Sequence, residues 1–333
     1  KELVAGDIGV VNKLEGVNTN DTLCAPDRIV KLRELDMPQP VYGLTIMAQD
    51  RKSEDKLNDF LHRITEEDLT FTVTFNSETK ESVISGMGEL HINMILDRIK
   101  DKQKIEIETK TPKVAYRETI TSPSSAEHTH KKQSGGHGQF GRVVLEIRPL
   151  ERGAEYEFEN AIRGQAVSKG YMPGIEKGIH EAMEEGFLAG YPIVDIGSTV
   201  VDGKEHPVDS SEMAFKAAGK GAFKAAVEKA NPVLLEPIMK LRVFADDQYL
   251  GDILSDLSSK RGRVQGQEDL GGGITQITAE VPQAEMLRYA IDLRSITSGT
   301  GSFELEFDHY EEVRGKIAEA VIEEAKKAAE VAE

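Results

Sequence analysis

The sequence of 333 residues predicts an α+β protein built from several small domains, and three observations support this fold class. The chain is long enough for about two domains, or for more if they are small. One order of elements, βαββαβ, is predicted twice, in residues 41–108 and 237–307, with a further α+β block between the copies. No apolar run reaches the roughly 18 residues of a membrane span, so none is predicted.

Residues 1–36 contain short apolar stretches between glycine turns, which predict strands but are too few for a domain. The segment Met37-Pro38-Gln39-Pro40 breaks the chain and predicts a boundary. In the first βαββαβ unit, strands are predicted at 41–48, 69–75, 82–85 and 104–108, and helices at 53–65 and 90–100. Ser53 is the predicted N-cap of the first helix.

In the second βαββαβ unit, strands are predicted at 237–245, 262–267, 273–281 and 302–307, and helices at 248–259 and 283–294. This order is that of the ferredoxin-like split unit, a common fold that does not specify function. A last helix from Glu312 carries one thin apolar stripe, which predicts that it docks on the last domain.

The central block contains Asp209-Ser210-Ser211-Glu212 in front of a helix with apolar residues on one side. This pattern predicts a capping box in which Asp209 accepts from the N3 amide and Glu212 reaches back. Capping alone is a sufficient reason for Asp209 and Ser210.

The segment from His128 to Val143 is polar and rich in glycine, so it cannot build a core. It lets the backbone visit positive φ and lets a large partner approach the main chain. Its pattern Gly136-x-Gly138-x-x-Gly141 matches the dinucleotide fingerprint and the kinase glycine loop, but the context excludes both. A Rossmann fingerprint needs a strand before it and a helix after it, and a kinase needs V-A-I-K, H-R-D and D-F-G motifs.

Lys131, Lys132 and Arg142, the histidines at 128, 130 and 137 and the open backbone amides of this segment suit phosphate oxygens and RNA 2′-hydroxyls. On composition alone, a solvated hairpin tip without a partner is an equal alternative. The three histidines lack a cysteine, so a metal site is not favoured.

The net charge of −17 argues against indiscriminate attraction to nucleic acid. Residues 127–148 nevertheless carry four Lys or Arg against two Glu, whereas 311–333 carry seven Glu against four Lys or Arg. An acidic body with a basic tip could dock that tip and limit other adhesion. The single cysteine, Cys24, cannot form an internal disulfide, which fits a reducing, cytoplasmic compartment.

No Walker A motif and no Gly-x-Ser-x-Gly motif occurs, so the sequence predicts no active site, no enzyme activity and no cofactor for these residues. The start at Lys1 lacks an initiator methionine and a signal peptide, which suggests a piece of a longer protein.

Three blocks stand out in the central part of the chain: Gln133-Ser134-Gly135-Gly136-x-Gly138-Gln139-Phe140-Gly141, Leu188-Ala189-Gly190-Tyr191-Pro192-Ile193-Val194-Asp195 and His206-Pro207-Val208-Asp209-Ser210-Ser211-Glu212. In sequence and order they resemble the fourth domain of bacterial elongation factor G. Gly86-Met87-Gly88-Glu89-Leu90-His91 resembles a third-domain motif of such factors, and Gly251-Asp252-Ile253-Leu254 with Arg261-Gly262 resembles the fifth domain. The resemblance covers nearly the whole chain.

The resemblance implies a C-terminal piece of a translational GTPase with two ferredoxin-like domains flanking a ribosomal-protein-S5-like α+β domain, and with the remnant of a β-barrel at the N-terminus. The implied divisions are 1–36 for the end of barrel domain II, 37–111 for domain III, 112–232 for domain IV, 233–310 for domain V and 311–333 for a C-terminal helix. GTP and Mg would bind in a missing N-terminal domain, which makes the parent protein a GTPase.

The resemblance implies GTP-dependent translocation of tRNA and mRNA, with two domain IV loops, about 131–141 and 202–209, entering the ribosomal decoding region. The partners are then the ribosome, with its rRNA and proteins, tRNA and mRNA; no membrane is involved, and the protein is a monomer. The residues implied to contact RNA or the ribosome are Lys131, Lys132, Gln133, Ser134, Gly135, Gly136, His137, Gly138, Gln139, Phe140, Lys204 and His206.

Two departures from the family pattern leave other functions open. His137 stands where the family often has arginine, and Pro207 replaces a frequent acidic residue. A paralogue that recycles ribosomes or protects them from a drug is one alternative. A free-standing RNA-binding or ribosome-assembly module is another, and a Walker A motif upstream of Lys1 would argue against it.

Overall fold

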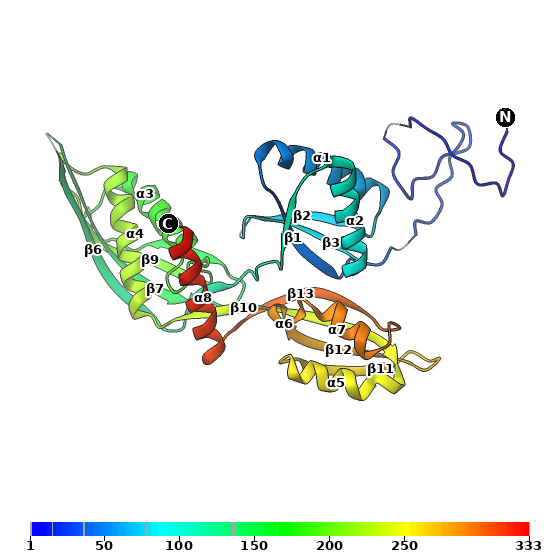
Figure 1. Ribbon diagram of the computed structural model, residues 1–333. Coiled ribbons are helices and arrows are strands. Elements are labelled where there is room, and N and C mark those ends of the chain that lie inside the picture. The colour runs from blue at the N-terminus through cyan, green and yellow to red at the C-terminus, as the bar shows by residue number, and fades with distance from the viewer. Residues whose placement is uncertain are drawn as a thin grey trace.

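The computed structural model describes residues 2–14, 16–35, 37–77, 79–134, 137–164 and 166–332. These residues form three sheets in three domains, which Figure 1 shows as separate bodies joined by short connections. The α+β multidomain fold predicted from the sequence is confirmed, with one exception at the N-terminus. The described residues before β1 contain no strand, so the predicted strands of a barrel remnant are not formed there.

The N-terminal prediction fails for a physical reason. A strand needs hydrogen-bonded neighbours, and an isolated pair of short strands is marginal in water. Ile8 and Val10, at the centre of the predicted strand region, are almost fully exposed. The apolar pattern of this segment is typical of strands, but no partner strand for it lies among the described residues, so no sheet forms there.

The first ferredoxin-like domain consists of β1 (Tyr42–Ala48), α1 (Arg51–Glu67), β2 (Thr72–Asn76), β3 (Glu81–Gly86), α2 (Glu89–Gln103) and β4 (Ile107–Lys110). The sheet order β2-β3-β1-β4, with antiparallel neighbours, confirms the predicted split βαββαβ unit. Helix α1 buries Leu57, Phe60, Leu61 and Ile64, which recur at helical spacing. Its N-cap is Asp50, whose carboxylate accepts from the amides of Lys52 and Ser53, so the prediction of Ser53 as the cap is wrong.

The central domain contains β6 (Ser124–Ser134), β7 (His137–Pro149), β8 (Tyr156–Asn160), the 3₁₀ turn η1 (Lys169–Tyr171), α3 (Met172–Glu185), β9 (Ile196–Lys204) and α4 (Glu212–Lys229). The sheet order is β6-β7-β9-β8, and only β8 and β9 pair in parallel, because α3 connects them as a crossover. Apolar residues of α3, α4 and the sheet form one core, which includes Val143, Leu145, Ile175, Ile179, Phe215 and Phe223.

The last ferredoxin-like domain consists of β10 (Pro232–Asp246), η2 (Asp247–Tyr249), α5 (Leu250–Ser259), β11 (Arg263–Asp269), β12 (Ile274–Pro282), α6 (Gln283–Met286), α7 (Tyr289–Ile296) and β13 (Ser302–Glu312). Its order β11-β12-β10-β13 repeats that of the first domain and confirms the second copy. The predicted helix 248–259 begins as a 3₁₀ turn, and the predicted helix 283–294 is two helices.

Strand β10 joins the central and last domains. Its first residues, Pro232 to Leu235, pair with β5 (Arg117–Ile120), and the remainder pairs with β12 and β13. Strand β5 therefore belongs to the sheet of the last domain, although the chain continues from it into the central domain. β10 is therefore one continuous strand that runs from the last domain to the base of the central domain. We call the region where β5 and β10 pair the root of the central domain.

Helix α8 (Lys316–Ala332) extends beyond the last domain. The predicted start at Glu312 is wrong, because β13 continues to that residue. Ile317, in the first turn of the helix, lies in a groove with Ile238 and Pro282 of the last domain, and the predicted docking is seen for this turn alone among the described residues. Burial raises the pKa of the Tyr116 and Tyr191 phenols, and the negative charge of Glu324, further along the helix, adds to both shifts. The helix therefore reaches from the last domain to the root of the central domain. Within the described residues, no helix is both long and apolar enough to cross a membrane.

Candidate nucleic-acid interface

The glycine-rich segment lies at the tip of a long hairpin. Strands β6 and β7 pair from Ser124 and Ile147 to Ser134 and His137, so the segment joins two antiparallel strands. Figure 1 shows this hairpin projecting away from both ferredoxin-like domains. A strand on each side is incompatible with the strand-to-helix turn of a Rossmann fingerprint, in agreement with the sequence analysis.

A second segment, at the end of β9, meets the hairpin at the same tip. The amide of Phe140 donates to the carbonyl of Asp209 at 2.8 Å, and the amide of Gly138 donates to the Asp209 carboxylate at 3.2 Å. The Ser210 hydroxyl donates to the Phe140 carbonyl at 2.9 Å. The two segments predicted as RNA-facing, 131–141 and 202–209, therefore form one tip, which we call the double-loop tip.

The close approach of the second segment explains two of the glycines. A Cβ on Gly138 would lie 2.9 Å from the Asp209 carboxylate, and a Cβ on Gly141 would lie 3.1 Å from the Ala214 carbonyl of α4. From the sequence alone, a main chain open to a large partner is predicted for this glycine stretch. At these two positions, the neighbour is the chain itself.

Asp209 and Ser210 do not cap α4, so that prediction is wrong. The N-cap is Ser211, whose hydroxyl accepts from the Ala214 amide at 3.2 Å. Asp209 and Ser210 lie before the helix begins and bond to the hairpin, as described above. Glu212 forms an ion pair with Lys177 of α3 at 2.7 Å. Three polar residues in a row can each supply a cap, and the sequence did not distinguish among them.

His206 is held at the edge of the double-loop tip. Its amide donates to the Ser210 hydroxyl at 2.8 Å, and its Nδ1 faces the amide of Asp209 at 3.2 Å. An Asp209 carboxylate oxygen lies 3.3 Å from the same nitrogen, and the imidazole meets the Phe140 ring edge to face, with centroids 6.2 Å apart. The side chain is about half exposed, and Nε2 is the nitrogen that faces away from these contacts. An imidazole held in this way can donate to a base or a phosphate.

Three lysines give the tip its positive charge. Lys131, Lys132 and Lys204 are exposed, and no ion pair to them occurs among the residues that the structure describes. Arg142 differs, because Glu127 and Asp202 bind its guanidinium, and the hydrogen bonds that it donates to Glu127 raise its pKa. Arg142 was grouped with the lysines as a phosphate-binding residue, but Glu127 and Asp202 within the sheet already balance its charge.

The remaining predicted contact residues fall into two groups. Gln139 is exposed, and its side chain bonds to His130 at 3.0 Å, while Phe140 is half-buried beside His206. Gln133, Ser134 and His137 have their backbones in the paired strands, but their side chains lie outside the described part of the chain. Gly135 and Gly136, which we also predicted as contacts, lie outside the described residues altogether.

Two apolar residues at the tip were not predicted from the sequence. Val208 is 76% exposed and Met213 is 67% exposed, beside the polar residues that join the loops. An apolar side chain held in solvent at a basic tip can contact the face of a base or a ribose. The exposure of Val208 could have been predicted from its place between Pro207 and Asp209, because a valine in such a polar turn is far from any core.

The metal alternative receives no support from the residues that can be seen. A Cβ on Gly221 would lie 2.4 Å from His128, so that imidazole packs against α4. His130 is engaged by Gln139. Over the described residues, no group of three or more His, Cys, Asp or Glu side chains could hold a metal ion.

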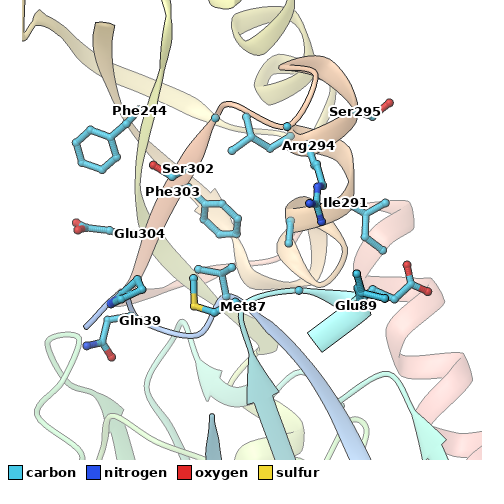
Figure 2. Close-up of a pocket in the computed structure, with 18 residues that line it drawn as sticks. Gln39, Met87, Glu89, Phe244, Ile291, Arg294, Ser295, Ser302, Phe303 and Glu304 are labelled. Carbon is cyan, nitrogen blue, oxygen red and sulfur yellow. The ribbon is translucent and has the colours of Figure 1, made fainter. Parts of the chain in front are cut away.

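A cavity of about 660 Å³ separates the two ferredoxin-like domains. Figure 2 shows Gln39, Met87 and Glu89 on one side, and Ile291, Arg294 and Phe303 on the other. Ala290 and Ile291 of α7 also touch the core of the first domain. Val41 in turn packs against the core of the last domain, so apolar contacts join these domains beside the cavity.

Comparison with known proteins identifies each of the three domains. Consecutive family models match residues 37–111 (Elongation Factor G, domain III), 112–231 (Elongation factor G, domain IV) and 233–321 (Elongation factor G C-terminus). A crystal structure of a protein from Thermus thermophilus is similar, with a TM-score of 0.78 and 40% sequence identity. The match covers 88% of this chain and 44% of that chain, so this chain spans less than half of the solved protein.

Proposed function

Because the chain belongs to the elongation factor G family of translation factors, we propose that it is the C-terminal portion of a GTP-dependent translocase. In this proposal, the double-loop tip enters the decoding region of the small ribosomal subunit and moves tRNA and mRNA by its shape. The observation that carries the proposal is the bonding of the two loops into one tip, through the Phe140 amide and the Asp209 carbonyl.

The chemistry of the tip supports contact with RNA. Lys131, Lys132 and Lys204 offer exposed ammonium groups for phosphates, and His206 offers a held imidazole for a base edge or a phosphate. The body of the protein is acidic, with a net charge of −17, so attraction to RNA is concentrated at the tip. The tip needs no group that makes or breaks covalent bonds for this task.

The proposal extends to the whole protein. A GTPase domain that binds GTP and Mg would drive the movement, and the ribosome, tRNA and mRNA would be its partners in the cytoplasm, where it acts as a monomer. The domain divisions at 36/37, 111/112, 232/233 and 310/311 belong to the same proposal. The ferredoxin-like domains would transmit motion from the GTPase domain to the tip.

The second candidate function is that of a paralogue with a related task. One residue of the tip, Pro207, favours it. Pro207 is exposed beside His206, at a position where the family frequently has an acidic residue. The loss of that charge leaves the tip more positive than the usual pattern. Ribosome recycling or protection would use the same tip without elongation, so a translocation assay of the full-length protein distinguishes these functions.

A photo-crosslinker at Val208 tests where the tip goes. Val208 is the most exposed apolar residue of the tip, so a crosslinking side chain there should leave the fold intact. In the full-length protein bound to ribosomes, we expect crosslinks to RNA of the decoding region. The matched control is Lys229, an exposed residue at the other end of α4, which should not reach that RNA. Equal crosslinking from both positions would contradict the proposal.

A further inference from the structure

A buried carboxylate lies at the root of the central domain, far from the double-loop tip. Glu118 is only 1% exposed, and its two oxygens accept four backbone N–H groups. One oxygen accepts from Phe187 and Leu188, both at 2.7 Å. The other accepts from Ala189 at 2.8 Å and from Tyr191 at 3.2 Å. A buried carboxylate with this number of amide donors is fully satisfied without a cation.

The loop that wraps Glu118 contains most of a sequence block that the proposed function leaves unexplained, residues 188–195. Its turn depends on Gly186, which has a φ of +70°, and a Cβ there would lie 2.4 Å from the Tyr191 carbonyl. The backbone of Glu118 adds two bonds, from its amide to the Pro192 carbonyl and from the Val194 amide to its carbonyl, each 2.9 Å long. The block is therefore shaped around one side chain of another strand.

Glu118 lies on a strand, and its loop connects a helix to a strand of another sheet. Glu118 lies on β5, which pairs with β10 in the sheet of the last domain. The loop connects α3 and β9 of the central domain. The bonds to Glu118 therefore tie a loop of the central domain to the strand that pairs with the sheet of the last domain, and we call this set of bonds the root latch.

Neighbouring contacts hold β5 on both sides. Towards the central domain, the Thr119 hydroxyl donates to the Val194 carbonyl at 2.8 Å, and the rings of Tyr116 and Tyr191 lie 5.3 Å apart. Towards the last domain, the Arg117 guanidinium lies 5.0 Å from the centre of the Tyr310 ring. These contacts leave Glu118 at the centre of the junction.

We propose that Glu118 is a positioning residue that sets the direction of the double-loop tip relative to the last domain. Its carboxylate joins the rigid body that carries the tip to the strand that continues, through β10, into the last domain. Without the latch, the amides of Thr121 and Ser122 still donate to the Ala230 carbonyl at 3.3 and 3.1 Å, and the central domain swings more widely about these remaining bonds. The consequence for translocation rests on the proposed function, whereas the latch itself does not.

The test measures the distance between the two domains in this chain, without ribosomes. Cys24, its single cysteine, is exposed and can be replaced by serine, and spin labels can then be placed at Thr129→Cys on β6 and Asp252→Cys on α5. Both positions are exposed and lie outside the latch. With Glu118 present, we expect one narrow distance distribution by pulsed electron spin resonance.

Glu118→Gln should broaden that distribution, because the new NH₂ group faces two amide donors where an oxygen accepted them. Ile179→Ala is the matched control: it weakens the core of the same domain but leaves the latch in place, so the distribution should stay narrow. Equal widths for Glu118→Gln and the parent, or equal broadening by Ile179→Ala, would overturn the proposal.

Glu118→Asp covers the case in which Glu118→Gln does not fold. This variant keeps the carboxylate but withdraws it from the amides by one methylene, so the distribution should again broaden; an unchanged width would overturn the latch.

In full-length protein, a latch variant that broadens the distances should also slow mRNA movement. Broad distances with normal mRNA movement would count against the proposed mechanical function. The proposal that Glu118 holds the two domains in one orientation would still stand.

Discussion

The two ends of the central domain use the same chemistry in opposite surroundings. At the root, the Glu118 carboxylate accepts four amides and is 1% exposed. At the tip, the Asp209 carboxylate accepts the amide of Gly138, and its side chain is 34% exposed. Both carboxylates join segments that are far apart in sequence. At the root the carboxylate is buried and both of its oxygens are used by amides, whereas the tip keeps charged groups in water.

This difference suits the two ends to different tasks in the mechanical function that we propose. A buried, fully satisfied network is costly to disturb, because each group left without a partner loses its full desolvation energy. An exposed network can exchange protein partners for water or for RNA at little cost. The root is therefore suited to hold a direction, and the tip is suited to adapt to a surface.

The largest effect should come from Glu118→Ala. It leaves four amides at the root without their acceptor, and we expect the free energy of unfolding of the central domain to fall by roughly 3–5 kcal/mol. Urea denaturation of the chain, followed at the transition of this domain, measures the change. Glu159→Ala, an exposed change in the same domain, should stay within about 0.5 kcal/mol of the parent. Similar losses for both variants would show that the four amide bonds to Glu118 do not stabilise the domain.

A charge reversal at the tip should affect binding and leave stability alone. The double change Lys131→Glu and Lys132→Glu should weaken ribosome binding roughly 10-fold or more, and should lower the slope of log affinity against log salt by about 2. Binding is measured at several salt concentrations with the full-length protein. Lys229→Glu, at the root end of α4, is the matched reversal and should change neither quantity. Insensitivity of binding to the lysine pair would count against an RNA-facing tip.

Asp209→Ala should loosen the tip by about 1 kcal/mol, the value of one hydrogen bond. We expect the amide of Gly138 to exchange with solvent faster, since it loses its acceptor. Asp209→Asn keeps an oxygen at that position and should retain the protection. Hydrogen exchange followed by NMR compares the two variants, and equal protection in both would show that backbone bonds alone join the loops.

The smallest effect is a pH dependence at the root. Burial, together with the charge of Glu236, raises the pKa of Tyr116 to about 12. The unfolded chain therefore loses its phenol proton first, so stability falls as pH rises from about 10 towards 12. Tyr116→Phe should reduce this loss, and thermal unfolding at pH 9 and 11 measures it. An identical loss in both proteins would show that the root is not as dry as the structure indicates.

The order of elements was predictable because hydrophobic periodicity is a local signal. Both βαββαβ units were predicted from the pattern, since residues such as Leu57, Leu61 and Ile64 recur at helical spacing. The extra length of β10 and the break between α6 and α7 were not predicted. They follow from pairing with β5 and from packing in the last domain, and these are tertiary effects.

The candidate site was predicted in part. The family resemblance implied that the two loops share one tip. The bond that Asp209 accepts from Gly138 and the bond that Ser210 donates to Phe140 account for this. Their predicted role as caps was wrong, because a short polar side chain before a helix can bond to the helix or to a distant strand. Glu118 gave no signal at all, since a glutamate in a short strand resembles any exposed glutamate until its partners are known.

The central claim is that the tip acts on RNA while another part of the protein supplies the energy. The direct measurement records GTP hydrolysis and mRNA movement side by side, in single-turnover reactions of the full-length protein with ribosomes. For His206→Ala, we predict that hydrolysis stays within about twofold of the parent and that mRNA movement slows at least about tenfold, a barrier increase of about 1.4 kcal/mol. Normal mRNA movement in this variant, or equal slowing of both reactions, would contradict the account.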